Sequence, residues 1–401
     1  QLVDAVLAKN ADLAVAGITL KQARLQAELA ENQQKIRVSS STGLSTGHSF
    51  NLNDGNDTSS GLSAKTGLSY EVDLFGKLAR QTEAKRWEAL ATEQDLQATA
   101  QSLIGTTAKL YWQLAYYNES RTTAEQSLAT SQKLYDLVKV QYQAGAVSGL
   151  DLTQAEQSVQ SQKASLSQIQ QSLVETRTAI AVLLHMPVQQ LSIDEPQRLP
   201  RLALPSIAAG LPADILSRRP DLKAAELRLR ESLATKDATT ASYYPSISLT
   251  GNIGSSSTSL TQLLKNPALT LGASLSLPFL QYNDMKRDLA ISQLDYEKAI
   301  VQYRQTLYQA FADVENALSA RTELSQQVQL QQRNLELAEK VERLTQVRYR
   351  YGAVALKTLL DQQETTRTAR LTLVNTKQSQ YNAYVTLMQA LGGSPIQQLP
   401  K

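Results

Sequence analysis

One stretch of the chain reads Val140-Gln141-Tyr142-Gln143-Ala144-Gly145-Ala146-Val147, and 207 residues later the chain reads Val347-Arg348-Tyr349-Arg350-Tyr351-Gly352-Ala353-Val354. Tyrosine, glycine, alanine and valine recur in register, and the same offset pairs Arg80 with Arg287. Self-similarity at a fixed period indicates repeated structural units. Each half then reads as helix, strand, loop, strand, long helix, tight turn and helix.

The segment before each turn glycine has the pattern of a very long helix. Residues 76–144 and 284–351 contain no proline, and apolar residues recur there at spacings of three and four. A helix of about 70 residues would be roughly 100 Å long at ~1.5 Å per residue. Such a length, with a remainder rich in glutamine, serine and threonine, indicates coiled-coil packing. The alternative is an ordinary helical bundle, but the strand-like segments argue against it.

Four short stretches change from the helical period to strict alternation of apolar and polar residues. They begin at Val38, Leu62, Ile247 and Leu269, and each is about 10 residues long, as a tilted membrane-crossing strand requires. One face is apolar and the other is small and polar, as in a water-filled barrel. We expect lipid to contact Leu249, Ile253, Leu271 and Leu275, and water to contact Ser248, Thr250, Ser274 and Ser276.

The number of strands predicts assembly. Four strands cannot close a barrel, and open strand edges are not tolerated in lipid. Two copies would supply 8 strands and three copies 12, and about 8 strands leave an interior that side chains fill. A conduit therefore favours three or more copies, and the choice between three and four stays open at this point.

The composition excludes several classes of protein. The 401 residues carry a formal net charge of +3, which is close to balance, so no preference for nucleic acid follows. The sequence contains no cysteine. No run of 18 apolar residues exists, which excludes a transmembrane helix. His48 and His185 are isolated in sequence, so we expect no metal site, no cofactor and no catalytic centre. Because Gln1 already begins a helical pattern, any export signal or lipid-carrying cysteine would lie upstream.

The repeat and the changes of period divide the chain into segments. Each half has a first helix, a strand pair and a long helical hairpin, and prolines cluster between the halves. The expected bounds are 1–37, 38–74 and 75–185 in the first half, 186–220 for the proline-rich equatorial linker, 221–245, 246–281 and 282–391 in the second half, and 392–401 for a C-terminal equatorial tail.

Three motifs resemble the TolC family of outer membrane efflux proteins, and more narrowly its lipoprotein branch, which serves resistance-nodulation-division pumps. The most specific is Leu211–Glu226, which reads LPADILSRRPDLKAAE. The others are Val72–Leu78 (VDLFGKL) and Tyr142–Gly145 (YQAG), and the resemblance covers nearly the whole chain. As structure alone, Arg218-Arg219-Pro220-Asp221 would be a helix stop and an N-cap, and no physical argument requires both arginines.

The resemblance implies a homotrimer with a 12-strand transmembrane β-barrel continued by a helical periplasmic tunnel. It implies a location in the outer membrane of a Gram-negative bacterium, with a lipid anchor on an upstream cysteine. The expected function is a passive exit duct for drugs or other toxic small molecules, not an enzyme. Its expected partners are a periplasmic adaptor, an inner-membrane pump and outer-membrane lipid. The alternative is a periplasmic coiled-coil adaptor or scaffold.

The family closes its tunnel near the helix turns with acidic rings and inter-helix hydrogen bonds. The resemblance carries these roles to Asp361, Asp151 and Tyr349. Two positions depart from the family, because Val354 stands where its best-known member has arginine, and Thr358 replaces a ring aspartate. Arg348 or Lys357 could substitute in the closing network. In the simpler interpretation, Asp361 only pairs with Lys357, one helical turn before it.

The turns at the far ends of the long helices are the expected contact with the adaptor. Small residues allow helix ends to approach closely, so bulky substitutions there would prevent docking. The expected docking residues are Ala144, Gly145, Ala146, Val147, Gly352, Ala353 and Val354.

Overall fold

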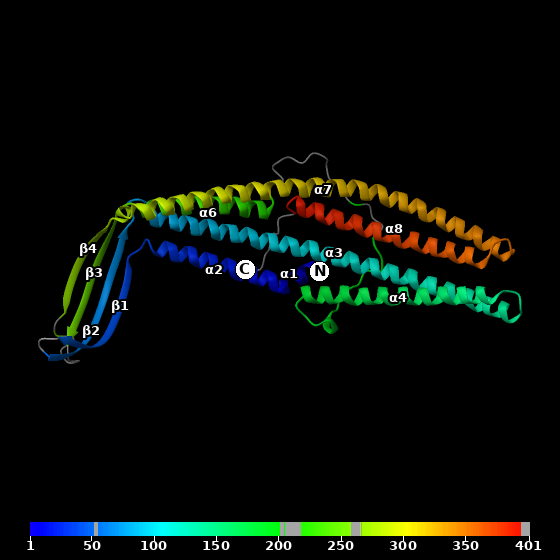
Figure 1. The fold of residues 1–401 in the computed structure, drawn as a ribbon, viewed down its shortest axis with the longest axis horizontal. Coiled ribbons are helices and arrows are strands. Elements are labelled where there is room, and N and C mark those ends of the chain that lie inside the picture. The colour runs from blue at the N-terminus through cyan, green and yellow to red at the C-terminus, as the bar shows by residue number, and fades with distance from the viewer. Residues whose placement is uncertain (52–54, 201–203, 205–217, 258–264, 266, 394–401) are drawn as a thin grey trace. The chain divides into compact units, whose positions relative to one another are not determined.

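Long helices and one small antiparallel sheet make up the chain in the computed structural model, which describes residues 1–51, 55–200, 204, 218–257, 265 and 267–393 (Figure 1). This mixed architecture confirms the predicted fold class. The chain divides into two compact units. The hairpin unit comprises Gln1–Gly17, Leu96–Pro220 and Leu307–Lys401, and the sheet unit comprises Ile18–Asp95 and Asp221–Thr306.

The sheet unit contains the four predicted strands, β1 (Arg37–Asn51), β2 (Gly55–Val72), β3 (Ser246–Ser257) and β4 (Ala268–Ser276), in the order β1-β2-β3-β4. Neighbouring strands are antiparallel. Helices α2 (Ala11–Asn32) and α6 (Pro220–Ser242) precede the two strand pairs, and the short helix η2 (Pro278–Leu280) follows β4.

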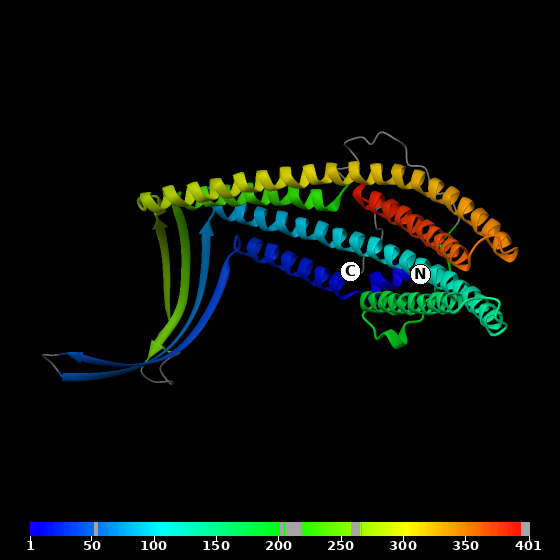
Figure 2. The same ribbon diagram turned by 45° about the vertical axis from the view of Figure 1, so that its right-hand side comes forward.

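The first strand pair is longer than predicted. The prediction was about 10 residues for each strand, with the second beginning at Leu62, yet β1 has 15 residues and β2, which begins at Gly55, has 18. Residues 51–60, which lie between the two predicted strands, are rich in Asn, Asp, Ser and Gly. Figure 2 shows these two strands running on beyond β3 and β4. The composition misled the prediction because backbone hydrogen bonds hold the ladder together whatever the polarity of its side chains.

The hairpin unit contains two helical hairpins. The first joins α3 (Lys77–Gln143) to α4 (Gly149–Leu183), and the second joins α7 (Tyr282–Arg350) to α8 (Leu356–Ala390) (Figure 1). The parts of α3 before Leu96 and of α7 before Leu307 belong to the sheet unit. Helices α3 and α7 are 67 and 69 residues long, which confirms the prediction of exceptionally long helices. The short helices α1 (Leu2–Lys9) and η1 (Val188–Gln190) complete this unit.

The expected first helix, 1–37, is interrupted. Asn10 has an extended backbone (φ −68°, ψ 131°) and separates α1 from α2. Its side chain replaces the missing helical partner, because Asn10 Oδ1 accepts the Leu13 backbone N–H at 3.1 Å, as an N-cap does.

The hydrophobic core of the hairpin unit is a series of small layers between long helices, not one central mass. One layer contains Leu335, Ala338, Ala369 and Leu373 from α7 and α8. Another contains Ala115, Val374 and Tyr381 with Leu199 from the segment that follows η1. Alanine recurs in these layers because close helix packing leaves little room for larger side chains. Among the described helices, none is both long enough and apolar enough to cross a membrane.

Candidate functional site

The four-stranded sheet has one apolar face and one polar face. Paired residues of antiparallel strands lie on the same face, and the register pairs Val38 with Leu68, Tyr70 with Leu249, and Ile247 with Leu275. Serine pairs with serine on the opposite face, as Ser248 does with Ser274. The expected lipid-facing set lies on the apolar face and is exposed, with exposed fractions of 46% for Leu249, 60% for Ile253, 78% for Leu271 and 61% for Leu275.

The polar face is kept open by small residues. A Cβ added to Gly67 would lie 2.5 Å from Asn252 Oδ1 and 2.9 Å from Ser39 Oγ, so no larger residue fits without movement of its neighbours. The sheet therefore presents apolar bulk on one side and mostly short polar side chains on the other, as the wall of a water-filled barrel does.

Aromatic side chains gather where the sheet meets the helices. The rings of Phe75 and Tyr244 stack with their centroids 4.9 Å apart. Phe279 and Tyr282 follow β4 and are 41% and 62% exposed. Exposed aromatic residues at the ends of an apolar strand band are typical of the interface between a bilayer and water.

The two hairpin turns have the same backbone geometry. Gly145 and Gly352 have φ of 73° and 71°, a region that favours glycine. At the first turn Gly145 N donates to Tyr142 O and Ala146 N donates to Gln141 O, both at 2.9 Å, and the second turn repeats this pattern. This is the Schellman ending of a helix. It presents the expected docking residues at the surface, with Val147 and Val354 half-buried and the other five exposed.

An apolar cluster holds the two turns together within the hairpin unit. Its buried members are Val138 of α3, Ala155 of α4 and Leu356 of α8. Tyr349, near the end of α7, packs against this cluster. Burial raises the pKa of the Tyr349 hydroxyl, and the nearby Asp151 carboxylate raises it further.

Asp151 has a structural role within its own hairpin. Its Oδ2 accepts hydrogen bonds from Ser148 N at 3.1 Å and Ser148 Oγ at 2.6 Å, and Asp151 N donates to Ser148 Oγ at 3.2 Å. This is a capping box at the start of α4. The second hairpin lacks it, because α8 has Ala355 at the equivalent N-cap position.

Asp361 pairs with Lys357 on α8, as the simpler interpretation expected. Lys357 Nζ donates to both Asp361 carboxylate oxygens at 2.9 Å. The two side chains are 64% and 63% exposed, so the pair contributes only about 0.3–0.5 kcal/mol to folding. Arg348 is exposed on the last turn of α7. The role of these residues in a constriction stays a prediction.

Two buried residues at the other end of the hairpins were missed as sites. Asn10 Nδ2 donates to Leu183 O, the last carbonyl of α4, at 3.1 Å. Arg219 Nη1 donates to Ala390 O, the last carbonyl of α8, at 3.4 Å, and Arg219 Nη2 binds Asp313 Oδ2 at 3.0 Å. Both residues therefore satisfy the unpaired carbonyl at the end of a returning helix. Arg219 gives a physical reason for one arginine of the Leu211–Glu226 motif, and that motif was the available signal.

The segment that links the two halves is fastened to the first hairpin. Arg177 Nε and Nη2 donate to Glu195 at 2.6 and 2.8 Å, and Leu199 N donates to Glu119 Oε2 at 3.1 Å. The Arg177 guanidinium lowers the pKa of the Glu195 carboxyl. The segment therefore braces the hairpin where it leaves α4.

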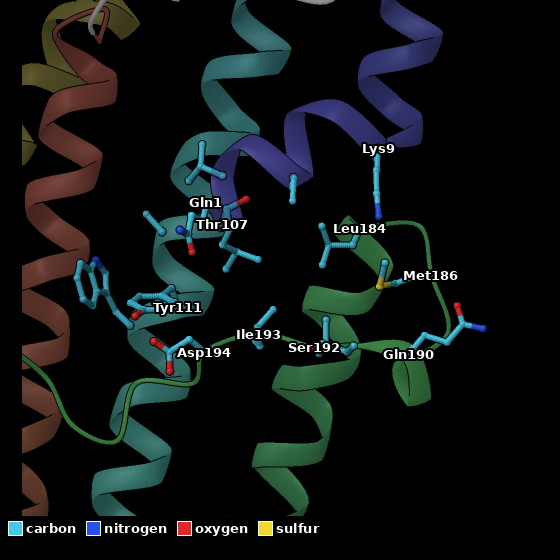
Figure 3. A pocket seen from close by; sticks show the side chains of 16 residues that line it. Gln1, Lys9, Thr107, Tyr111, Leu184, Met186, Gln190, Ser192, Ile193 and Asp194 are labelled. Carbon is cyan, nitrogen blue, oxygen red and sulfur yellow. The ribbon is translucent and has the colours of Figure 1, made fainter.

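A cavity of about 810 Å³ lies beside this segment (Figure 3). Thr107 and Tyr111 of α3 and Met186 after α4 line it, together with Ile193. The described lining is mostly apolar, with Lys9 and Asp194 as its charged side chains. This arrangement suits packing or an apolar ligand.

The two histidines are far apart in the sequence and belong to different elements. His48 belongs to β1, and His185 ends α4 with φ of 52° in a Schellman turn, where Met186 N donates to Ala181 O at 3.1 Å. Within the described residues, no cluster of three His, Cys, Asp or Glu side chains could hold a metal ion.

Comparisons with known proteins agree with this geometry. A family model described as outer membrane efflux protein matches residues 2–184 and 211–393. The pyoverdine export outer membrane protein OpmQ of Pseudomonas putida is 30% identical, over 98% of this chain and 85% of its own. The toluene efflux pump outer membrane protein TtgC of Pseudomonas putida is 30% identical, over 99% and 83%. The structure of the open state of the Neisseria gonorrhoeae MtrE outer membrane channel aligns with a TM-score of 0.85 at 28% identity, over 98% and 88%.

Proposed function

The chain belongs to the outer membrane efflux protein family, and from that premise we propose that it forms a passive exit duct for small toxic molecules, driven by an inner-membrane pump. It resides in the outer membrane. The observation that carries the proposal is the sheet with one exposed apolar face and one face of short polar side chains. Lipid would cover the first face and water would fill the space beside the second.

The open edges of this sheet support a homotrimer. Within the part of the chain that the structure describes, β1 and β4 each have a strand neighbour on one side only, in the order β1-β2-β3-β4. Such edges must be paired within a bilayer, because an unsatisfied backbone group costs several kcal/mol there. Pairing β4 of one copy with β1 of the next continues the antiparallel order, and three copies would close 12 strands around a channel.

Apolar stripes on two helices of the sheet unit support the same pairing. Helix α2 leads into β1 and exposes Ile18, Leu25 and Leu29, while α7 follows β4 and exposes Ile291 and Leu294. Joining the β4 edge to the β1 edge would bring α7 of one copy beside α2 of the next. Both stripes would then be buried between copies, as a coiled coil requires.

We also propose two protein partners, a periplasmic adaptor and an inner-membrane pump. A periplasmic adaptor would contact the exposed docking residues at the two turns, and the pump would supply the energy. Relatives named for toluene efflux and pyoverdine export make organic molecules the favoured cargo. In a trimer, three copies of Asp361 around one axis would concentrate negative potential in the narrow part of the tunnel.

A duct requires no catalysis, so we propose that the chain is not an enzyme. The alternative function, a periplasmic adaptor or scaffold, does not fit a family of outer membrane efflux proteins.

The test combines reconstitution with a susceptibility panel. Purified protein in planar bilayers should give discrete conductance steps, and a deletion strain should become more sensitive to organic toxicants and regain resistance from the plasmid-borne gene. A control with Leu271→Arg, on the apolar face of β4, should insert less efficiently and restore less resistance than the unaltered protein. The duct proposal fails if purified, membrane-inserted protein conducts no ions and the deletion changes no susceptibility.

A further inference from the structure

A second, smaller cavity interrupts the contact between the two hairpins. Its volume is about 220 Å³, and α3, α4, α7 and α8 all contribute to its lining. The lining is polar, with hydroxyl groups from Ser131, Ser158 and Thr366 and the amide of Gln162. An apolar cluster around Val138 lies on the turn side of this cavity.

Gln162 is the buried polar group that defines this cavity. The side chain is 5% exposed, and its Nε2 donates to Glu364 Oε2 at 3.3 Å. That bond fixes the orientation of the amide, because an ionised carboxylate can only accept. Gln162 Oε1 must therefore accept a hydrogen bond, yet no group in the described chain donates to it.

The two arginines near Gln162 and the Thr366 hydroxyl already donate to other groups. Arg367 Nε donates to Glu364 Oε2 at 2.8 Å, and Arg370 Nη2 donates to Glu339 Oε1 at 2.7 Å. The Thr366 hydroxyl is shared between Gln362 O at 3.1 Å and Ala338 O at 3.3 Å. A buried carbonyl oxygen in a roomy polar cavity is the usual setting of an ordered internal water.

We propose that this cavity holds a cluster of ordered water molecules bonded to Gln162 Oε1, and that this hydrated layer is where the two hairpins slide past each other when the turns separate. The cluster around Val138 loses apolar burial when the hairpins part. The polar layer loses little stabilising free energy when the hairpins move, because water replaces each hydrogen bond that is broken. Movement is therefore easiest at the level of Gln162. The second half of this inference rests on the proposed duct function.

The first test concerns water alone and uses the unaltered protein. A high-resolution structure of the assembled wild type should show ordered water within hydrogen-bond distance of Gln162 Oε1. A side chain that fills the cavity, or a protein donor on Gln162 Oε1, would overturn the proposal. This result does not depend on whether the protein conducts ions.

The second test concerns sliding and uses Gln162→Leu, which fills the site with an apolar side chain of similar size. Glu364 keeps both bonds from Arg367, so no buried charge is left unpaired. The variant should assemble normally, unfold at a higher temperature and show a several-fold smaller open fraction in planar bilayers.

The matched control is Gln160→Leu, the same change at an exposed position of α4, which should behave as the wild type. Wild-type gating in Gln162→Leu, with the wild type itself conducting, would overturn the sliding layer. A wild type that does not conduct would instead contradict the duct function. If Gln162→Leu fails to assemble, Gln162→Met, which lacks the same hydrogen bonds, repeats the comparison.

Discussion

At the scale of single residues, a substitution at the two turns can test docking to the adaptor only if it does not also strain the backbone. Gly145 and Gly352 have positive φ, so any substitution there costs about 1–2 kcal/mol of strain and would confuse a docking experiment. Ala146 and Ala353 are exposed one residue later and are free of this constraint. They are the better positions at which to test the adaptor contact.

Tryptophan at both Ala146 and Ala353 should abolish efflux, because bulk at the helix ends prevents close approach of the adaptor. Trimer assembly should be unchanged, as measured by native mass. Gln157→Trp, on an exposed position of α4, is the control for added bulk. Normal efflux in the double variant would place the adaptor contact elsewhere.

The pair between Asp361 and Lys357 allows the acidic constriction to be tested in both directions. Asp361→Asn should lower the preference of the channel for cations, and Lys357→Gln should raise it, since Lys357 Nζ neutralises Asp361. Stability should change by less than about 0.5 kcal/mol, because the pair is exposed. Reversal potentials in planar bilayers measure the preference. Unchanged selectivity in both variants would contradict a ring of Asp361 in the tunnel.

At the scale of elements, the segment after η1 should loosen in acid. Arg177 lowers the folded-state pKa of Glu195 below 4.5, so the stability it provides is present above that value and is lost as pH falls through the lowered pKa. Glu195→Gln should cost about 1–2 kcal/mol near neutral pH. The difference in thermal midpoint between wild type and variant should shrink below pH 4.5. A difference that is independent of pH would exclude this charge effect.

The two faces of β4 should respond in opposite ways to a charge. Leu271→Arg places a charge on the apolar face and should cost about 2–4 kcal/mol near the bilayer midplane. Thr270→Arg, the adjacent residue on the opposite face, should be tolerated and should alter conductance. Urea unfolding from lipid vesicles measures the first effect. Equal costs for both variants would show that the assignment of the faces is wrong.

At the scale of the whole molecule, the unpaired edges of β1 and β4 require assembly. Native mass measurement in detergent should give a particle of three chains, each of 44.0 kDa. A change that disrupts the edge of β1 or β4 should abolish both assembly and barrel closure, because both depend on these edges. A stable monomer or dimer that still conducts ions would contradict the 12-strand barrel.

Much of the fold could be predicted because its signals are local. Strand alternation, helical spacing and the glycines at 145 and 352 lie within a few residues of the structures they specify. The capping box of Ser148 and Asp151 also has a local signal, since a serine precedes an acidic residue by three positions, whereas the resemblance predicted a role for Asp151 in closing the tunnel. The lengths of β1 and β2 were underestimated because composition cannot reveal backbone pairing.

By itself, then, the sequence determined the long helices, the four strands with their two faces, and the membership in a family of outer membrane ducts. Only the tertiary structure decided how distant residues meet. Arg219 reaches Ala390 O across 171 positions, and Gln162 reaches Glu364 across 202. No local pattern names the partner in such contacts, because the two groups lie far apart in the sequence and one of them can be a backbone carbonyl. The contacts form only when long helices pack side by side and bury these groups away from water.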